Sequence, residues 1–239
     1  MTISVAVVGA SGRMGTLALE LIEASQHFRL HSALDSKSDL KEVLGADVIF
    51  EVTKFEVSEK VVDFAIANDM NIVVGTSGWS ATALAAVDKK LQGSKASVTI
   101  VPNFSIGSAL ATKFAAESAK YFENIEIVET HHAGKIDSPS GTAVRTAELI
   151  AEARGETPLV PGVGQPARGQ IVAGVPVHSL RLHNGVTKQE VNLAGSNEML
   201  TLSHEVSSIN AYVNGMISTI QFAAKANGLT VGLQAVLGL

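Results

Sequence analysis

The stretch VAVVGASGRMGTLALELI, residues 5–22, decides the fold. An apolar run leads into glycines at positions 9, 12 and 15, and a helical pattern of apolar residues follows. Glycine lets the backbone turn tightly and approach a pyrophosphate, while the start of the helix supplies N–H groups and a positive dipole end. This strand, turn and helix predict a dinucleotide site. Its spacing is G-x-x-G-x-x-G, with Ala10 where the commoner G-x-G-x-x-G pattern has its first glycine.

An acidic residue stands where such a site needs one. Asp35 closes the next predicted strand, 20 residues past Gly15, so its carboxylate is expected to accept from ribose hydroxyls. An acid at this position favours NADH, whereas Lys37 and Arg13 leave room for the 2′-phosphate of NADPH. The sequence therefore predicts a nicotinamide dinucleotide and leaves the preference between NADH and NADPH open.

The first hundred residues alternate between two kinds of pattern. Short apolar runs typical of strands covered on both faces occupy 3–9, 30–34, 47–52, 71–75 and 97–101, and helical spacing of apolar residues occupies 13–24, 57–68 and 81–92. This alternation predicts an α/β domain, a Rossmann-type doubly wound parallel sheet with right-handed crossovers.

The rhythm changes after residue 105. A helix is expected at 108–121, a strand at 124–130, alternating strands of a largely antiparallel sheet between 175 and 204, and a last helix near 210–226. Three prolines make 154–169 a loop. We therefore predict a dinucleotide-binding domain at 1–105 with a C-terminal return at 214–239, and a second α+β domain at 106–213.

The composition narrows the function classes. The 239-residue chain is 46% hydrophobic and 17% charged, its formal net charge is -5, and it has no cysteine. An acidic chain of this kind has no basic footprint for nucleic acid, and disulfides, thiolate metal sites and cysteine nucleophiles are excluded. The first residues lack the features of a signal peptide, and no apolar run reaches about 18 residues, so we expect a cytoplasmic protein without a membrane span.

Two further turns follow predicted strands. GTSGW (75–79) and VPNFSIG (101–107) lie at the carboxyl ends of strands, where open α/β sheets bind their ligands. Their backbone, and the side chains of Thr76 and Asn103, are candidates for contact with a nicotinamide or a substrate. Thr53, after the third predicted strand, is a candidate for the same contacts.

The stretch ETHHAGKIDSPSGTA, residues 129–143, concentrates chemistry. His131, His132 and Lys135 precede a Ser-Gly-Thr turn. A metal site would need further ligands such as Asp137 and His183, whose geometry nothing in the sequence fixes. Ser140 as a nucleophile would need a strand–turn–helix elbow that is not there. Acid catalysis beside an anion site is the third alternative, and it uses every part of the stretch.

In that third alternative the turn opens a helix. Ser138 or Ser140 would cap it with Pro139 in the first turn, and Gly141 would leave room for an anion beside the first N–H groups. The helix dipole adds roughly 0.3–1 kcal/mol to anion binding, and each charge-assisted hydrogen bond, as from Lys135 or the side chain of Thr142, about 1.5–3 kcal/mol. We expect bound carboxylates to raise the pKa of a neighbouring histidine, which could then act as a general acid.

These residues carry a family resemblance. The stretches VGASGRMG (8–15), VVGTSGW (73–79), VPNFSIG (101–107), HHAGKIDSPSGTA (131–143) and GLTVGLQAVLGL (228–239) resemble the 4-hydroxy-tetrahydrodipicolinate reductase (dihydrodipicolinate reductase) family of diaminopimelate and lysine biosynthesis. They span nearly the whole chain, and the histidine–lysine–PSGTA block is highly specific.

The resemblance implies NAD(P)H-dependent reduction of a cyclic imine dicarboxylate by a homotetramer, in which the domain at 106–213 serves substrate binding and oligomerisation. It implies His131 and Lys135 as the catalytic pair and His132, Gly141 and Thr142 as substrate contacts. The implied cofactor contacts are Gly9, Ala10, Ser11, Gly12, Arg13, Met14, Asp35, Gly75, Thr76, Ser77, Val101, Pro102, Asn103 and Phe104. No metal is implied.

The sequence departs from the family pattern at three places. Gly134 stands where the family often has a histidine, Glu51 and Val52 replace the usual aspartate and phenylalanine before Thr53, and 207–215 lacks an arginine near its start. Two other functions stay open. Another small Rossmann dehydrogenase acting on an imine or amino acid, such as an aspartate dehydrogenase, or a non-catalytic NAD(P) sensor would each explain the glycine turn but not the histidine–lysine block.

Overall fold

The structure is a computed structural model and describes residues 2–155, 165–183 and 186–239. The chain forms two compact units, residues 1–106 with 209–239, and residues 107–208. The second boundary comes before the predicted residue 214 because a 3-10 turn at Ile209–Tyr212 runs directly into helix α6. Most of the predicted loop at 154–169, including Pro158 and Pro161, lies outside the described residues.

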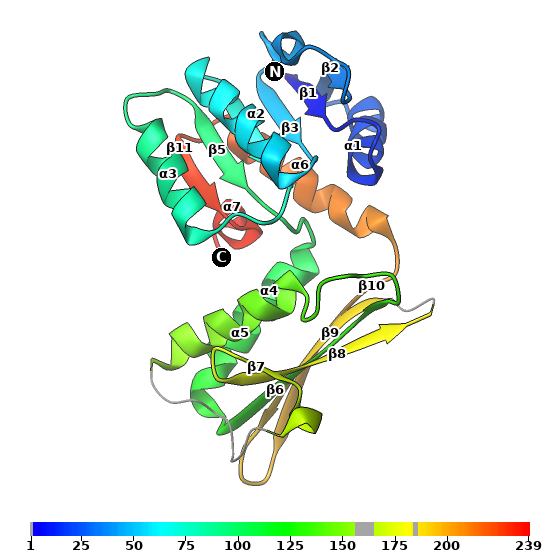
Figure 1. The fold of residues 1–239 in the computed structure, drawn as a ribbon, viewed down its shortest axis with the longest axis vertical. Coiled ribbons are helices and arrows are strands. Elements are labelled where there is room, and N and C mark those ends of the chain that lie inside the picture. The colour runs from blue at the N-terminus through cyan, green and yellow to red at the C-terminus, as the bar shows by residue number, and fades with distance from the viewer. Residues whose placement is uncertain (1, 156–164, 184–185) are drawn as a thin grey trace. The chain divides into compact units, whose positions relative to one another are not determined.

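The first unit is built on a six-stranded parallel sheet, seen in Figure 1. Its strand order is β11-β5-β4-β3-β1-β2, with crossovers through helices. The strands are β1 (Ile3–Val8), β2 (Phe28–Leu34), β3 (Val48–Glu51), β4 (Asn71–Val74), β5 (Ser97–Ile100) and β11 (Gly228–Val231), and the helices are α1 (Arg13–Ala24), α2 (Phe55–Ala67), α3 (Ala81–Leu91), α6 (Val213–Ala223) and α7 (Leu233–Leu237). The predicted doubly wound sheet is confirmed, and β11 adds a sixth strand at one edge.

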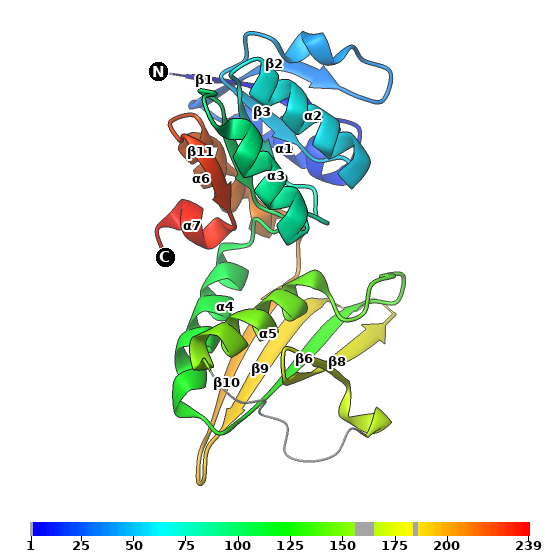
Figure 2. The same cartoon turned by 60° about the vertical axis from the view of Figure 1, so that its left-hand side comes forward.

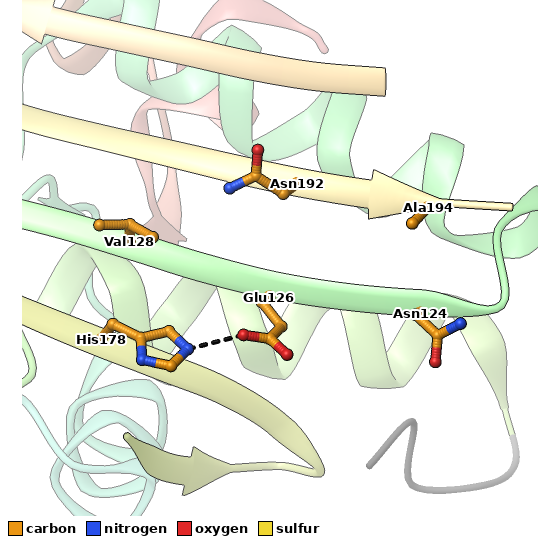
Figure 3. A pocket seen from close by; sticks show the side chains of 6 residues that line it. All are labelled: Asn124, Glu126, Val128, His178, Asn192 and Ala194. Atoms are coloured by element: carbon orange, nitrogen blue, oxygen red, sulfur yellow. Dashed lines mark hydrogen bonds and ion pairs between the residues drawn. The ribbon is translucent and has the colours of Figure 1, made fainter. Parts of the chain in front are cut away.

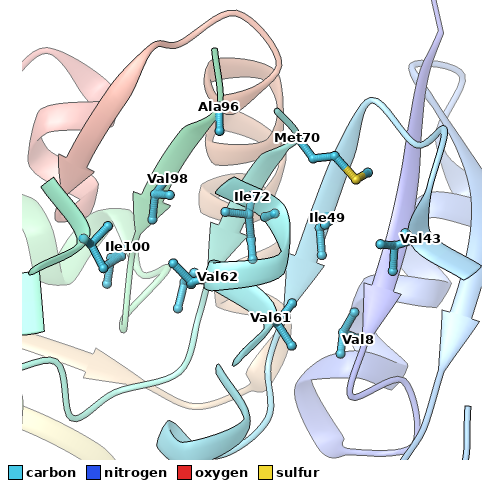
Figure 4. Close-up of a cluster of buried hydrophobic side chains, with 14 of the residues drawn as sticks. Val8, Val43, Ile49, Val61, Val62, Met70, Ile72, Ala96, Val98 and Ile100 are labelled. Atoms are coloured by element: carbon cyan, nitrogen blue, oxygen red, sulfur yellow. The ribbon is translucent and has the colours of Figure 1, made fainter. Parts of the chain in front are cut away.

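Helices cover both faces of this sheet. Successive side chains of a strand point to opposite faces. Ile49, Ile72 and Val98 therefore face α2 and α3, where Val61 and Val62 of α2 complete a buried cluster, drawn in Figure 4. α1 and α6 lie on the opposite face (Figures 1 and 2). Burial on both faces explains why the strands read as nearly continuous apolar runs.

The second unit has a five-stranded mixed sheet of order β10-β9-β6-β8-β7. Its strands are β6 (Asn124–His132), β7 (Gln170–Val172), β8 (Val175–Leu182), β9 (Thr187–Ala194) and β10 (Met199–Val206), and its helices are α4 (Ile106–Ser118), which begins one residue before the unit, and α5 (Gly141–Arg154). Only β6 and β8 pair in parallel, so the predicted largely antiparallel sheet is confirmed among the described residues.

Alternation along β6 separates the two faces of this sheet. Ile125 and Ile127 are buried in an apolar cluster with residues of α4 and α5. Glu126 and Val128 point the other way, into a pocket on the face opposite the helices (Figure 3). There the Glu126 carboxylate accepts from Nε2 of His178 at 2.7 Å.

Candidate active site

The glycine turn has the close backbone packing that its sequence predicts. Gly9 has a φ of +91°, and the N–H groups of Gly9 and Ala10 both donate to the carbonyl of Leu34 at 3.0 Å. A Cβ on Gly15 would lie 2.1 Å from the carbonyl oxygen of Gly9, so no other residue fits there. Gly12 is the N-cap of α1 and its side-chain-free backbone leads directly into the helix.

Asp35 lies beside this turn, because the preceding residue, Leu34, accepts the two turn N–H groups. Oδ1 of Asp35 accepts from the backbone N–H of Lys37 at 2.8 Å and from Oγ of Ser38 at 3.3 Å. These bonds fix the carboxylate in a local turn and hold Lys37 next to it. The acidic and basic residues predicted to discriminate between cofactors therefore share one turn.

The turns at 75–79 and 101–107, which the sequence predicts for nicotinamide contact, meet at the carboxyl edge of the parallel sheet. Gly75 follows β4, and a Cβ on it would lie 2.8 Å from Val52 Cγ1 and 2.9 Å from Phe104 Cε2. The ring of Phe104 stacks on Phe50 at a centroid distance of 5.5 Å, and Oδ1 of Asn103 accepts from the N–H of Ser105. Residues 75–77 and 101–104 are thus brought together, as predicted.

A buried glutamate underlies these turns, and its role is not evident from the sequence. Glu51 is fully buried, and its Oε1 accepts from the N–H of Thr53 at 2.6 Å and from Oγ1 of Thr76 at 2.9 Å. The Thr53 hydroxyl donates to the same oxygen, and Ser58 of α2 donates to Oε2 at 2.5 Å. Oγ1 of Thr76 also accepts from the Thr53 N–H at 2.9 Å, so that hydroxyl links the turns after β3 and β4.

In the second unit, the histidines end strand β6 and the anion turn begins α5. Ser140, not Ser138, is the N-cap, and its Oγ accepts from the N–H of Ala143 at 3.3 Å. Pro139 therefore precedes the cap, and its predicted place in the first turn is wrong. The capping bond also occupies the Ser140 hydroxyl, which argues against Ser140 as a nucleophile. A Cβ on Gly141 would meet no atom within 4 Å, so an anion can approach that position from open space.

The catalytic candidates are held by charged partners. Nδ1 of His131 lies 2.5 Å from Oε2 of Glu129, and Nζ of Lys135 lies 2.7 Å from Oδ1 of Asp137. The backbone N–H of Lys135 donates to the carbonyl of His132 at 3.1 Å, which closes the turn at Gly134. No group of three or more histidine, aspartate and glutamate side chains arranged for a metal ion occurs in the described ranges.

Two residues that the sequence did not single out complete this site. Glu129 is fully buried, and Arg181 of β8 donates to both of its oxygens, from Nη1 at 2.9 Å and from Nη2 at 2.8 Å. The alternation of Glu129 and His131 along one strand is a signal for the first of them. Arg181 is 52 positions away in the chain, and only the parallel pairing of β6 with β8 brings it to Glu129.

The electrostatics of the site lower the pKa of His131. Burial lowers the pKa of His131, and Lys135 and Arg181 lower it further, so the raising effect of Glu129 is outweighed. The raised histidine pKa expected beside bound carboxylates concerns the complex with substrate and stays a prediction. Burial raises the pKa of Glu129, but hydrogen bonds, the strongest of them from Arg181, hold it below its ordinary value.

Comparison with known proteins addresses the family. A model of the N-terminus of dihydrodipicolinate reductase matches residues 3–104, and a model of its C-terminus matches residues 107–237. A 4-hydroxy-tetrahydrodipicolinate reductase of Clavibacter sepedonicus is 48% identical, over 100% of this chain and 87% of the relative. Another from Streptomyces griseus is 41% identical over 98% of each chain.

Solved structures agree with these relatives. A dipicolinate-bound dihydrodipicolinate reductase from Paenisporosarcina sp. TG-14 matches with a TM-score of 0.85 and 28% identity, over 98% of this chain and 99% of that one. A scyllo-inositol dehydrogenase from Lactobacillus casei, at 11% identity and a TM-score of 0.64, shares the fold alone. The predicted resemblance is confirmed, and the alternatives of another dehydrogenase or a sensor are not favoured. Both halves of the chain therefore belong to the dihydrodipicolinate reductase family.

Proposed function

We propose that this chain reduces 4-hydroxy-tetrahydrodipicolinate to tetrahydrodipicolinate with NAD(P)H, in diaminopimelate and lysine biosynthesis, with His131 and Lys135 as its catalytic pair. Membership of the reductase family over both halves of the chain supports the reaction. The single structural observation that carries the site is the histidine–lysine block beside the open start of α5, with His131 bonded to a buried carboxylate.

The residues of the first unit fit the cofactor of this family. Gly9 and Gly15 leave no room for a Cβ, so only glycine allows this tight turn, which presents the backbone from Gly9 to Met14 at the N-terminus of a 12-residue helix, a place that favours a pyrophosphate. Asp35 is placed to bind the adenosine ribose through Oδ2, and residues 75–77 and 101–104 to bind the nicotinamide side. Bound NAD(P)H supplies the hydride.

The second unit provides the anion and proton chemistry. Gly141 and Thr142 start a 14-residue helix, whose first-turn amides and dipole favour a carboxylate. His132 and Lys135 add donors to the same region. We assign these groups to binding the dicarboxylate, which places the ring for attack and leaves His131 or Lys135 to deliver the proton.

The ring nitrogen of His131 that serves the substrate follows from its hydrogen bond. Because Nδ1 is bonded to Glu129, Nε2 is the nitrogen left for a substrate. The side chain is only 14% exposed, so water has limited access to that proton. A bound dicarboxylate would add negative charge and so favour the protonated imidazole that the protein's own groups disfavour.

The test is oxidation of NADH and of NADPH, assayed in parallel with freshly generated 4-hydroxy-tetrahydrodipicolinate. Wild-type protein should oxidise at least one of them, and His131→Gln should lose about a hundredfold or more in kcat while binding the cofactor normally. If folded wild-type protein binds NADH but oxidises neither cofactor with this substrate, a dehydrogenase of another imine or a sensor becomes the better reading.

The proposal includes a homotetrameric assembly in the cytoplasm, which rests on the family resemblance alone. Sedimentation of the purified chain tests the assembly directly. Among the described helices, none is long and apolar enough to cross a membrane.

A further inference from the structure

We infer that Glu129 and Arg181 form a positioning pair for the reduction, which orients His131 and anchors the loop that carries Lys135. The inference rests on the proposed function. Neither residue need touch the substrate, since each acts through a group already assigned to catalysis.

The first step is the orientation of the imidazole. Glu129 and His131 are two residues apart on β6, so their side chains lie on the same face of the sheet. The buried Glu129 carboxylate accepts a hydrogen bond from Nδ1 of His131 at 2.5 Å. This bond selects the tautomer with a proton on Nδ1 and directs Nε2 away from the carboxylate. A histidine without this partner would sample both tautomers.

The second step is the anchoring of the catalytic loop. Arg181 is the β8 partner of His131 in the parallel ladder. Its guanidinium binds both Glu129 oxygens, and Nη2 also donates to the backbone carbonyl of Asp137 at 2.7 Å. Asp137 in turn pairs with Lys135, so one guanidinium connects the buried carboxylate to the loop that presents the ammonium group.

The same carboxylate reaches the anion site. The backbone N–H of Ser140, the N-cap of α5, donates to Oε1 of Glu129 at 3.2 Å. Glu129 therefore has three kinds of partner, namely the catalytic histidine, the arginine that anchors the loop, and the N-cap residue of the helix that would bind the substrate. A residue with only a folding role would not need to join all three.

The two residues of the pair also place charges of opposite sign near His131. The groups that face the ring are Glu129 from its own strand, Arg181 from β8 and Lys135 from the following loop. Glu129 raises the pKa of His131, and Arg181 lowers it. Removing one charge or the other should thus move the titration of His131 in opposite directions, which mere loosening of the fold would not do.

The experiment measures the His131 imidazole titration by NMR in the full-length protein, with the signal identified by its loss in His131→Gln. Glu129→Gln should shift the midpoint to lower pH, and Arg181→Met should shift it to higher pH. Both should lower kcat by about tenfold to a hundredfold, as is typical when the partner that orients a functional histidine is lost, with NADH affinity unchanged within about twofold. Glu198→Gln and Arg145→Met, at exposed positions, are the matched controls.

Shifts in the same direction, no shift at all, or unchanged kcat in folded variants would overturn the inference. Should Arg181→Met fail to fold, Arg181→Lys serves instead. It keeps the charge but cannot bind both Glu129 oxygens and the Asp137 carbonyl, so kcat should fall while the titration stays in place. Failure of the wild-type chain to turn over the substrate would count against the proposed function, whereas the titration tests the pair independently.

Discussion

Each compact unit contains a fully buried glutamate near the end of a strand, and the two are held in different ways. Glu51 at the end of β3 is bound by three hydroxyls and one backbone N–H, all of them neutral donors. Glu129 in β6 is bound by a guanidinium, an imidazole and one backbone N–H. Burial of a carboxyl group is costly without such partners, and the molecule meets that requirement with dipoles in one place and with charges in the other.

The difference matches what each region has to do. The Glu51 donors belong to the turns after β3 and β4 and to the first turn of α2, so the carboxyl group fixes backbone positions without a cationic side chain at the cofactor edge. The Glu129 partners include His131, which we propose as one of the catalytic pair. Each charge near His131 shifts the pKa of its ring, so the charged partners that hold the ring in position also affect its protonation.

The largest effect on stability is expected from Arg181→Met. Removal of one partner of a buried pair leaves the other charge uncompensated, which costs about 3–5 kcal/mol. We therefore expect the free energy of unfolding in urea to fall by about 3 kcal/mol, whereas Arg145→Met, which removes an exposed arginine, should change it by less than about 1 kcal/mol. Equal losses in the two variants would show that the charged region is no more dependent on its partners than the surface is.

The neutral region should respond less, through Glu51→Gln. The amide nitrogen that replaces one carboxyl oxygen cannot accept, so one of the donors from Thr53, Thr76 or Ser58 loses its acceptor, at about 1–3 kcal/mol. We expect unfolding to become easier by about 2 kcal/mol, and NADH to bind about tenfold more weakly because the turns at 53 and 76 lose their common anchor. Glu59→Gln, at an exposed position of α2, is the control.

Fluorescence titration with NADH tests the tenfold loss of affinity predicted for Glu51→Gln. If Glu51→Gln binds NADH as tightly as Glu59→Gln does, the hydroxyl network is a folding element only. The contrast between the two glutamates would then be one of stability and not of function.

The sequence also predicts the structure of the first unit more fully than that of the second. The glycine turn and the strand–helix alternation predict the parallel sheet because both signals are local. Strand β11 was not predicted, since GLTV begins with a glycine and has only two large apolar side chains, and its pairing with β5 at the sheet edge defines it. Glu51 was noted only as a departure from a family motif, whereas its burial and its four donors make it the centre of the turn.

In the second unit the motif gave His131 and Lys135, but not what holds them. Glu129 opens the same stretch, and its place two residues before His131 was a usable signal. Arg181 could not be inferred in this way, because the partner depends on the register of β6 with β8 and nothing in VPVHSLRL specifies that register. The lowering of the His131 pKa by burial and by Arg181 could not be inferred for a related reason, since both act on that ring from outside its local sequence.

A smaller loss is expected from Thr76→Val, which removes the hydroxyl between Glu51 and the Thr53 N–H. The Thr53 N–H keeps its bond to Glu51, so the cost should be close to that of a single hydrogen bond, about 1 kcal/mol. NADH affinity should fall by no more than about fivefold, measured against Thr82→Val at an exposed position. A loss as large as that of Glu51→Gln would mean that the hydroxyl of Thr76 contacts the cofactor after all.

The smallest effect should appear in the pH dependence of stability around Glu129. The pKa of folded His131 is below 6.5, its value in an unfolded chain, so on acidification the unfolded state takes up the proton first and stability falls as the pH drops below about 6.5. Glu129 affects stability at lower pH, because its folded pKa is depressed, and its contribution is lost only as the pH falls through that depressed value.

Urea unfolding between about pH 7.5 and 5.5 should therefore report the histidines alone, and His131→Gln should flatten the slope of stability against pH by a fraction of a kcal/mol. His204, whose pKa burial also lowers, should account for part of the slope that persists. An unchanged slope in His131→Gln would mean that the ring is not held neutral by the fold, and the charged region would then resemble the neutral one more closely than its hydrogen bonds indicate.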